Sequence, residues 1–176
     1  KVECSESARF VYIVFAVHYN PGAIGSYHRD KAVFARSQDY GATFEMPKMI
    51  APEEYNSRYH DIATRADNEI YVSWQQDSGQ GTGYWYLHNY FIKSTNNGTS
   101  FTSWVRLDDG DYASTRYDKP ALAIDDSARL YAAFVSVYPN RYLYYDLSES
   151  AGISFGTDRR IDETGTINPF DPPKIA

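Results

Sequence analysis

A short polar turn occurs three times in this chain of 176 residues. Each copy begins with a serine. A small or acidic polar residue follows two positions later, a glycine four positions later and a phenylalanine seven positions later. Glycine can adopt positive φ, and short polar side chains accept hydrogen bonds from nearby backbone N–H groups. The pattern therefore predicts three tight hairpin turns, each followed by a buried ring, built from Ser37, Asp39, Gly41, Thr43 and Phe44; Ser94, Asn96, Gly98 and Phe101; and Ser148, Gly152 and Phe155.

The spacing of the turns predicts the size of the repeating unit. Gly41, Gly98 and Gly152 are 57 and 54 positions apart, a period that is too long for a hairpin and suits a four-stranded unit. Apolar segments recur in phase with the turns, two before each turn and a short one after it, and none of them has the period of a helix. An all-β chain of three four-stranded units is predicted.

The turn resembles the Asp-box, a repeat found in the β-propellers of sialidases and of many non-catalytic secreted proteins. The first copy matches the pattern in full, the second has Asn96 and Ser100 in place of Asp and Thr, and the third has Ser150 and Ser154. The resemblance covers nearly the whole chain. It implies a segment of a sialidase-like β-propeller with three four-stranded blades, in which the turn residues are structural and lie on the face opposite the binding loops.

The order of the strands predicts an offset at both ends of the segment. Blade 1 is expected over about residues 1–51 without its inner strand, blade 2 over 58–108 and blade 3 over 117–162, and residues 172–176 have the sequence of an inner strand for a neighbouring blade. Because propellers use about four to eight blades, three cannot close a ring. The ring is therefore expected to be completed by a second copy with exchanged end strands, or by missing sequence of a longer chain.

Composition excludes several classes of function. The net charge of −6 argues against a nucleic-acid surface, which needs a basic face, and no apolar run reaches the roughly 20 residues of a membrane span. Cys4 is the only cysteine and the four histidines show no metal-ligand spacing, so we expect neither an internal disulfide nor a metal or other cofactor. The start at Lys1 suggests a removed signal peptide or a cut from a longer protein. The resemblance to propellers of secreted proteins implies an extracellular or cell-surface location. Asn97 begins a possible glycosylation sequon.

Residues suited to ligand binding cluster in the loops expected on the face opposite the turns. Aromatic rings beside fixed polar groups are what a sugar-binding surface needs. Sialidases, moreover, hold the substrate carboxylate with three arginines from such positions. Arg58 and Arg116 are 58 residues apart and are expected at equivalent places, with ion pairs to Asp61 and Asp118 as the alternative role; the third arginine is missing from residues 167–170. The candidate ligand-binding residues are Arg58, Tyr59, Trp85, Tyr86, Arg116, Tyr117 and Asp118.

Two hypotheses for function follow. The first is a non-catalytic extracellular binding or structural module that recognises glycan or protein through its loop face. The second is part of an exo-sialidase-like glycoside hydrolase, which would need a Tyr nucleophile activated by Glu and an acid/base Asp, with the missing residues on other blades. No tyrosine among the 17 stands out as a nucleophile, so the sequence favours the first hypothesis.

Overall fold

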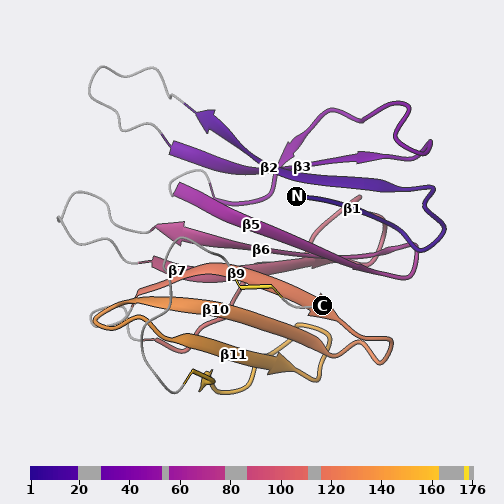
Figure 1. Ribbon diagram of the computed structural model, residues 1–176. Helices are drawn as coiled ribbons and strands as arrows, with labels where there is room; N and C mark the ends of the chain where they lie inside the picture. Colours follow the sequence, from indigo (N-terminus) through magenta and orange to yellow (C-terminus); the bar gives the residue numbers. More distant parts are fainter. Residues whose placement is uncertain (20–28, 53–55, 78–86, 111–115, 163–172, 175–176) are drawn as a thin grey trace.

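A computed structural model of the chain describes residues 1–19, 29–52, 56–77, 87–110, 116–162 and 173–174. Within these ranges it contains twelve strands in three four-stranded antiparallel sheets (Figure 1) and no helix that could cross a membrane. The sheets are blade 1, with β1 (Val2–Cys4), β2 (Val11–Tyr19), β3 (Arg29–Ser37) and β4 (Lys48–Met49); blade 2, with β5 (Asn56–Arg65), β6 (Glu69–Asp77), β7 (Leu87–Ser94) and β8 (Val105–Arg106); and blade 3, with β9 (Arg116–Ile124), β10 (Leu130–Tyr138), β11 (Leu143–Ser148) and β12 (Arg159–Arg160).

Blade 1 has its own inner strand, which corrects the prediction that this strand is missing. β1 pairs with β2 so that Glu3 lies opposite Tyr12, just as Ala63 lies opposite Tyr71 in blade 2. The segment escaped sequence reasoning because three residues held by backbone hydrogen bonds need no apolar pattern. Part of the edge predicted to receive a donated strand is thus already paired. Most of residues 172–176 lie outside the described residues, and Pro173 and Lys174 form no strand.

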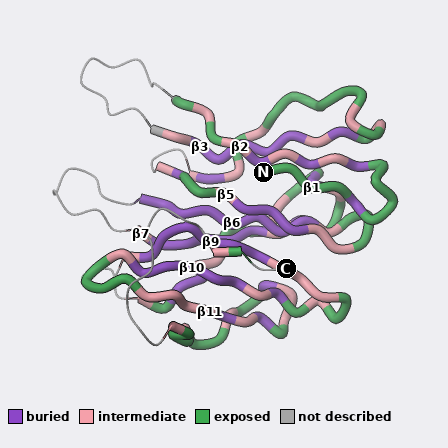
Figure 2. The backbone as a smooth tube through the Cα atoms, in the orientation of Figure 1, coloured by how far each residue is buried: buried purple, intermediate pink, exposed green. Residues whose placement is uncertain are grey.

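The hydrophobic core lies between the blades. One cluster joins blades 1 and 2, and a second joins blades 2 and 3, because successive side chains of a strand point to opposite faces of its sheet. Figure 2 shows the middle blade buried along most of its strands. The first cluster contains Phe10, Tyr12, Val14, Ala32, Phe34, Ala51, Ile62, Ile70, Val72, Trp74, Tyr90 and Ile92, and the second Ala63, Tyr71, Phe91, Leu107, Tyr117, Leu122, Leu130, Ala132 and Phe134.

The three repeat turns share one hydrogen-bond pattern. The serine hydroxyl oxygen accepts a bond from the glycine N–H at 2.9 Å in the first turn and 2.8 Å in the other two. The residue two positions after the serine then accepts a bond from the N–H four residues further on, at 2.8 Å for Asp39, 3.0 Å for Asn96 and 3.0 Å for Ser150. An amide or hydroxyl oxygen thus replaces the carboxylate with little change of geometry.

The ring that ends each turn packs against the preceding blade. Phe101 lies edge-on to Phe34 of blade 1 with ring centroids 5.0 Å apart, and Phe155 meets Phe91 of blade 2 at 5.5 Å. Phe44 of the first turn is 43% exposed, so the prediction of a buried ring is wrong for this copy. No described blade precedes blade 1, and the ring therefore lacks the surface that covers its two counterparts.

Candidate functional site

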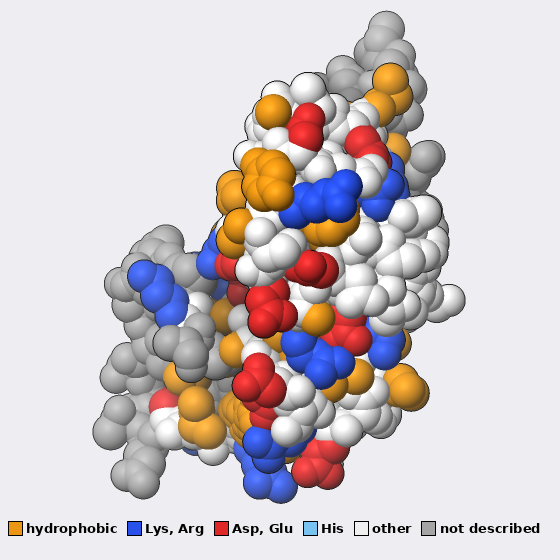
Figure 3. All heavy atoms as spheres, turned by 90° about the vertical axis from the view of Figure 1, so that its right-hand side faces the viewer, with side chains coloured by type: hydrophobic (Ala, Val, Ile, Leu, Met, Phe, Trp, Pro, Cys, Tyr) orange, Lys and Arg blue, Asp and Glu red, His pale blue; other side chains and the backbone are white. Residues whose placement is uncertain are grey.

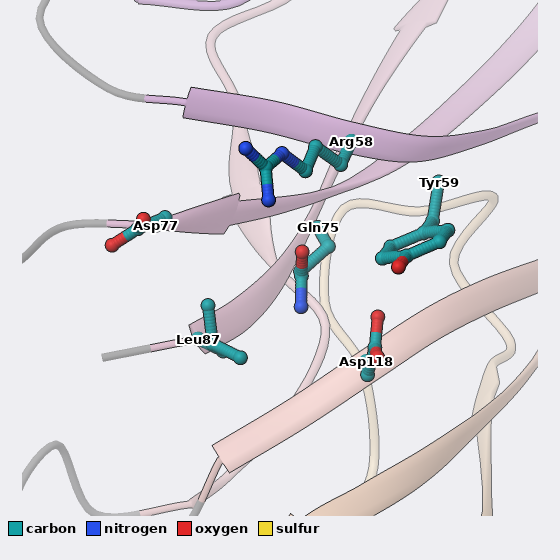
Figure 4. Close-up of a pocket in the computed structure, with 6 residues that line it drawn as sticks. All are labelled: Arg58, Tyr59, Gln75, Asp77, Leu87 and Asp118. Atoms are coloured by element: carbon teal, nitrogen blue, oxygen red, sulfur yellow. The ribbon is translucent and has the colours of Figure 1, made fainter. Parts of the chain in front are cut away.

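A pocket of about 240 Å³ lies between blades 2 and 3, at the ends of the sheets away from the repeat turns. The turn end, seen in Figure 3, mixes acidic, basic and hydrophobic side chains over its surface. The pocket end gathers side chains from four strands around one hollow, and all of them except Leu87 carry a polar group. These are Arg58 and Tyr59 from β5, Gln75 and Asp77 from β6, Leu87 from β7, and Asp118 from β9 (Figure 4).

Matching irregularities in the two inner strands shape this pocket. Tyr59 and Lys119 both have positive φ, at 50° and 54°, and each sits at a shift of the register with the next strand. Such a bulge re-aims the neighbouring side chains. The Lys119 ammonium lies over the Tyr59 ring, 5.4 Å from its centroid, so the two bulges are also in contact with each other.

The strand register shows that Arg58 and Arg116 are not at equivalent places. Arg58 pairs with Gln75, four residues after Tyr71, and Asp118 pairs with Val135, four residues after Tyr131. Asp118 therefore takes the place of Arg58 in blade 3. Equivalent residues of the inner strands are 60 positions apart, whereas the turn glycines are 57 and 54 positions apart, because the links between turns and inner strands differ in length. The sequence comparison of the two arginines, which are 58 residues apart, was therefore wrong by two positions.

Asp118 is the most unusual polar group in the pocket. Its residue is 9% exposed, and its Oδ1 is buried without a hydrogen-bond partner in the described part of the chain. Burial raises the pKa of Asp118 to about 6, although Lys119 and Arg58 act in the opposite direction. Since an unsatisfied buried carboxyl is costly, the group is ready to exchange a hydrogen bond with a ligand that enters the pocket.

The charge of Arg58 is already engaged. Its Nε donates to Asp30 Oδ2 at 2.9 Å, and His18 Nδ1 lies 3.1 Å from the other oxygen of the same carboxylate. Partial burial alone would raise the pKa of Asp30, but the bonds from His18 and Arg58 hold it below its usual value. The alternative pair with Asp61 is not formed, since Asp61 instead meets the Lys1 ammonium at 3.1 Å.

The other predicted ligand-binding residues are dispersed. The Arg116 guanidinium lies over the Tyr138 ring, 5.0 Å from its centroid, and does not line the pocket. Tyr117 is 5% exposed and packs edge-on against Phe134 and Tyr144, so it belongs to the core. Trp85 and Tyr86 lie outside the described residues. The structure thus brings together Arg58, Tyr59 and Asp118 from the predicted set.

Sequence reasoning missed the contribution of β6. Gln75, Gln76 and Asp77 end a strand in which most of the preceding residues are apolar, and all three are at most 7% exposed. Three consecutive buried polar residues are unusual, and this run was the available signal that the strand ends at a polar pocket. Elsewhere, Asn97 is half-buried in its turn with its side-chain oxygen buried. Among the described residues no three His, Cys, Asp or Glu side chains are placed to hold a metal ion.

Comparison with solved structures identifies the architecture as a sialidase-like β-propeller fold. A Hadza microbial sialidase matches with a TM-score of 0.66 and 12% identity over 88% of this chain and 35% of its own. The sialidase of Trypanosoma rangeli in complex with the inhibitor DANA matches with a TM-score of 0.62 and 13% identity over 92% of this chain and 30% of its own. The α-L-arabinanase of Penicillium chrysogenum complexed with arabinobiose matches with a TM-score of 0.60 and 11% identity over 89% of this chain and 46% of its own. The chain thus spans less than half the length of these structures. No protein-family model and no curated protein sequence matches it.

Proposed function

We propose that this chain is part of an extracellular, non-catalytic carbohydrate-binding propeller whose ligand enters the pocket between blades 2 and 3. The buried Asp118 carboxyl, with one oxygen free of hydrogen bonds among the described residues, is the observation that carries the proposal. A sugar hydroxyl can both donate and accept, so it satisfies this carboxyl in either protonation state. The fold shared with sialidases and an arabinanase supports a glycan-related module.

The other lining groups suit one pyranose ring. Tyr59 is 50% exposed and offers a ring on which a sugar face can stack, and the Gln75 amide supplies a donor and an acceptor nearby (Figure 4). A pocket of about 240 Å³ has room for a single sugar residue. The Lys119 ammonium already covers part of Tyr59, which leaves space for stacking on the open part of the ring.

The charges favour a neutral sugar over an acidic one. Arg58 is bound to Asp30, and the position that would hold a second arginine carries Asp118. A carboxylate ligand would meet the Asp118 carboxyl in the same hollow, and like charges in a partly buried site repel. The ligand class proposed here is therefore a neutral, hydroxyl-rich glycan.

Titration calorimetry against neutral oligosaccharides, after a glycan array that includes sialylated sugars, tests the proposal. Tyr59→Ala and Asp118→Ala should each weaken binding of a neutral glycan at least tenfold, because each removes a side chain that the bound sugar is proposed to contact. Asp126→Ala, an exposed change in the turn between β9 and β10, is the matched control and should bind as the parent does. Binding of sialylated sugars alone, or of protein ligands alone, would contradict the proposed ligand class.

A second candidate function, part of an exo-sialidase-like hydrolase, draws support from one feature. A carboxyl with a pKa of about 6 is suited to general acid catalysis near neutral pH. A sialidase-type mechanism also needs a Tyr nucleophile and a Glu, which other blades would have to supply. Release of a fluorescent aglycone from sialosides or other glycosides, abolished by Asp118→Asn, would favour this candidate; binding without turnover favours the module.

A further inference from the structure

Asp30 of blade 1 is bonded to both charged residues that blade 2 contributes to the pocket, one directly and one through Asn56. It lies in β3 opposite His18 of β2 and is not among the residues that line the pocket. Its Oδ2 accepts a hydrogen bond from Arg58 Nε at 2.9 Å, and its backbone N–H donates to Asn56 Oδ1 at 3.1 Å. Asn56 Nδ2 in turn donates to Asp77 Oδ2 at 3.3 Å. A third blade thus acts on a pocket that lies between the other two.

The Asp30 carboxyl is ionised at neutral pH. Partial burial acts to raise its pKa, but the bonds from His18 and Arg58 outweigh this effect and hold the pKa below the ordinary value. The side chain is 30% exposed and that of Arg58 51% exposed, so solvent screens the two charges only in part. Asp30 and Arg58 therefore form a true ion pair beside the pocket.

This ion pair changes what Arg58 can offer a ligand. A guanidinium has five N–H donors, and the bond to Asp30 is made by Nε. The Nη groups can still donate to the hydroxyls of a neutral sugar. The attraction of Arg58 for a second anion is much reduced, because the field of a close pair of opposite charges falls off faster than that of a single charge.

We propose that Asp30 is a specificity-determining residue of this carbohydrate site: its charge, acting through Arg58, makes the pocket select a neutral sugar over the corresponding uronic acid. This inference rests on the function proposed above. Asp118 favours the same choice from blade 3 by direct repulsion, whereas Asp30 does so by occupying the cation. Without the charge of Asp30, the planar Arg58 guanidinium would be available to a ligand carboxylate.

Calorimetry with two matched glycosides tests this role. The probes are the neutral hexoside that the glycan array selects and the corresponding hexuronide, which carries a carboxylate in place of the hydroxymethyl group. At pH 7 the parent should bind the hexoside more tightly. Asp30→Asn keeps an oxygen that can accept from Arg58 Nε but removes the charge. It should change the affinity for the hexoside less than threefold and raise the affinity for the hexuronide at least fivefold.

Three further measurements show whether the gain comes from the charge of Arg58. Adding Arg58→Gln to Asp30→Asn should abolish it, since the carboxylate then has no cation to meet. Raising sodium chloride from about 0.05 M to about 0.5 M should diminish it, because salt screens exposed charges. Asp126→Asn, an exposed change of the same charge in the turn between β9 and β10, is the matched control and should keep the parent's ratio of affinities.

The outcomes separate the role of Asp30 from the function on which it rests. If Asp118→Ala weakens binding of the hexoside while Asp30→Asn leaves the ratio of the two affinities unchanged, the role of Asp30 is refuted and the binding function stands. A gain that survives Arg58→Gln or added salt, or that Asp126→Asn reproduces, also refutes it. If the parent binds neither glycoside, the proposed function fails and the role of Asp30 fails with it.

Discussion

At the scale of single residues, the glycines of the repeat turns differ in what surrounds them. All three have positive φ, but a Cβ on Gly98 would lie 2.5 Å from the Phe34 ring and one on Gly152 2.4 Å from Phe91. A Cβ on Gly41 would meet only Val11, at 3.7 Å. The same residue type therefore serves backbone conformation in the first turn, and both conformation and contact between blades in the other two.

We expect Gly98→Ala to destabilise the protein more than Gly41→Ala does. Gly41→Ala should cost about 1 kcal/mol for the positive φ alone. Gly98→Ala should cost about 2 to 4 kcal/mol, because the ring of Phe34 must also move. Urea denaturation followed by circular dichroism measures both, and equal losses would contradict the contact assigned to Gly98.

Asp118 should make stability depend on pH. Its folded pKa of about 6 is above the ordinary 3.8, so between these values the folded state holds a proton that the unfolded state has lost. Stability from this group is therefore greatest below about pH 4 and falls as pH rises through 6. Asp118→Asn should raise the free energy of unfolding at pH 7 by about 1 to 3 kcal/mol and leave it nearly unchanged at pH 4. A gain of equal size at both pH values would contradict the assignment.

At the scale of elements, blades 2 and 3 are joined by polar contacts as well as by the core. The Asp109 N–H donates to Asp158 Oδ2 at 3.0 Å, and the Asp158 N–H donates to Asp109 Oδ2 at 3.1 Å. Burial raises the pKa of Asp158 to about 7, and the nearby carboxylates of Asp109 and Asp108 act in the same direction. Two carboxyl groups thus share a boundary between blades, and one of them favours its protonated form.

The link between blades 2 and 3 should loosen as Asp158 ionises. Because its folded pKa lies above the ordinary value, its contribution is lost as pH rises from about 4 through 7. Asp158→Asn keeps a side-chain oxygen that can accept the hydrogen bond from the Asp109 N–H, but it cannot ionise, so the stability of the variant should depend less on pH. We expect its free energy of unfolding at pH 8 to be higher than the parent's by about 1 kcal/mol after allowance for solvent screening. Thermal melts across this pH range provide the measurement, and a variant with the parent's pH profile would show that Asp158 does not titrate in this way.

At the scale of the whole molecule, stability depends on interfaces between blades. Trp74 and Phe34 share the cluster that joins blades 1 and 2, whereas Phe44 points from blade 1 without a neighbouring blade among those described. A four-stranded sheet of this kind cannot bury its apolar faces by itself and needs a neighbouring sheet to cover them. The blades should therefore unfold together.

Phe34→Ala should cost about 3 to 5 kcal/mol and lower the midpoint of a single cooperative transition seen by both Trp fluorescence and circular dichroism. Phe44→Ala should cost less than about 1.5 kcal/mol, because the ring is partly exposed. This value replaces the larger loss expected for a buried ring. Two separate transitions in the parent would show that the blades are independent.

The sequence by itself determined the repeating four-stranded architecture, because turn chemistry is local: Ser37, Asp39 and Gly41 bond within a few residues of one another. It also indicated Arg58, Tyr59 and Asp118 as candidates, since loops rich in aromatic and charged residues stand out in any alignment of the repeats.

Only the tertiary structure decided which of these residues meet. The links between turns and inner strands vary in length, so the register that places Asp118 in the position of Arg58 depends on backbone pairing and two bulges, and sequence period alone misplaced Arg116. Likewise Asp30 reaches Arg58 from another blade, and Phe101, unlike Phe44, is partly buried because it packs against the blade that precedes its turn. Such contacts join residues far apart in the chain, and local physical chemistry cannot specify them.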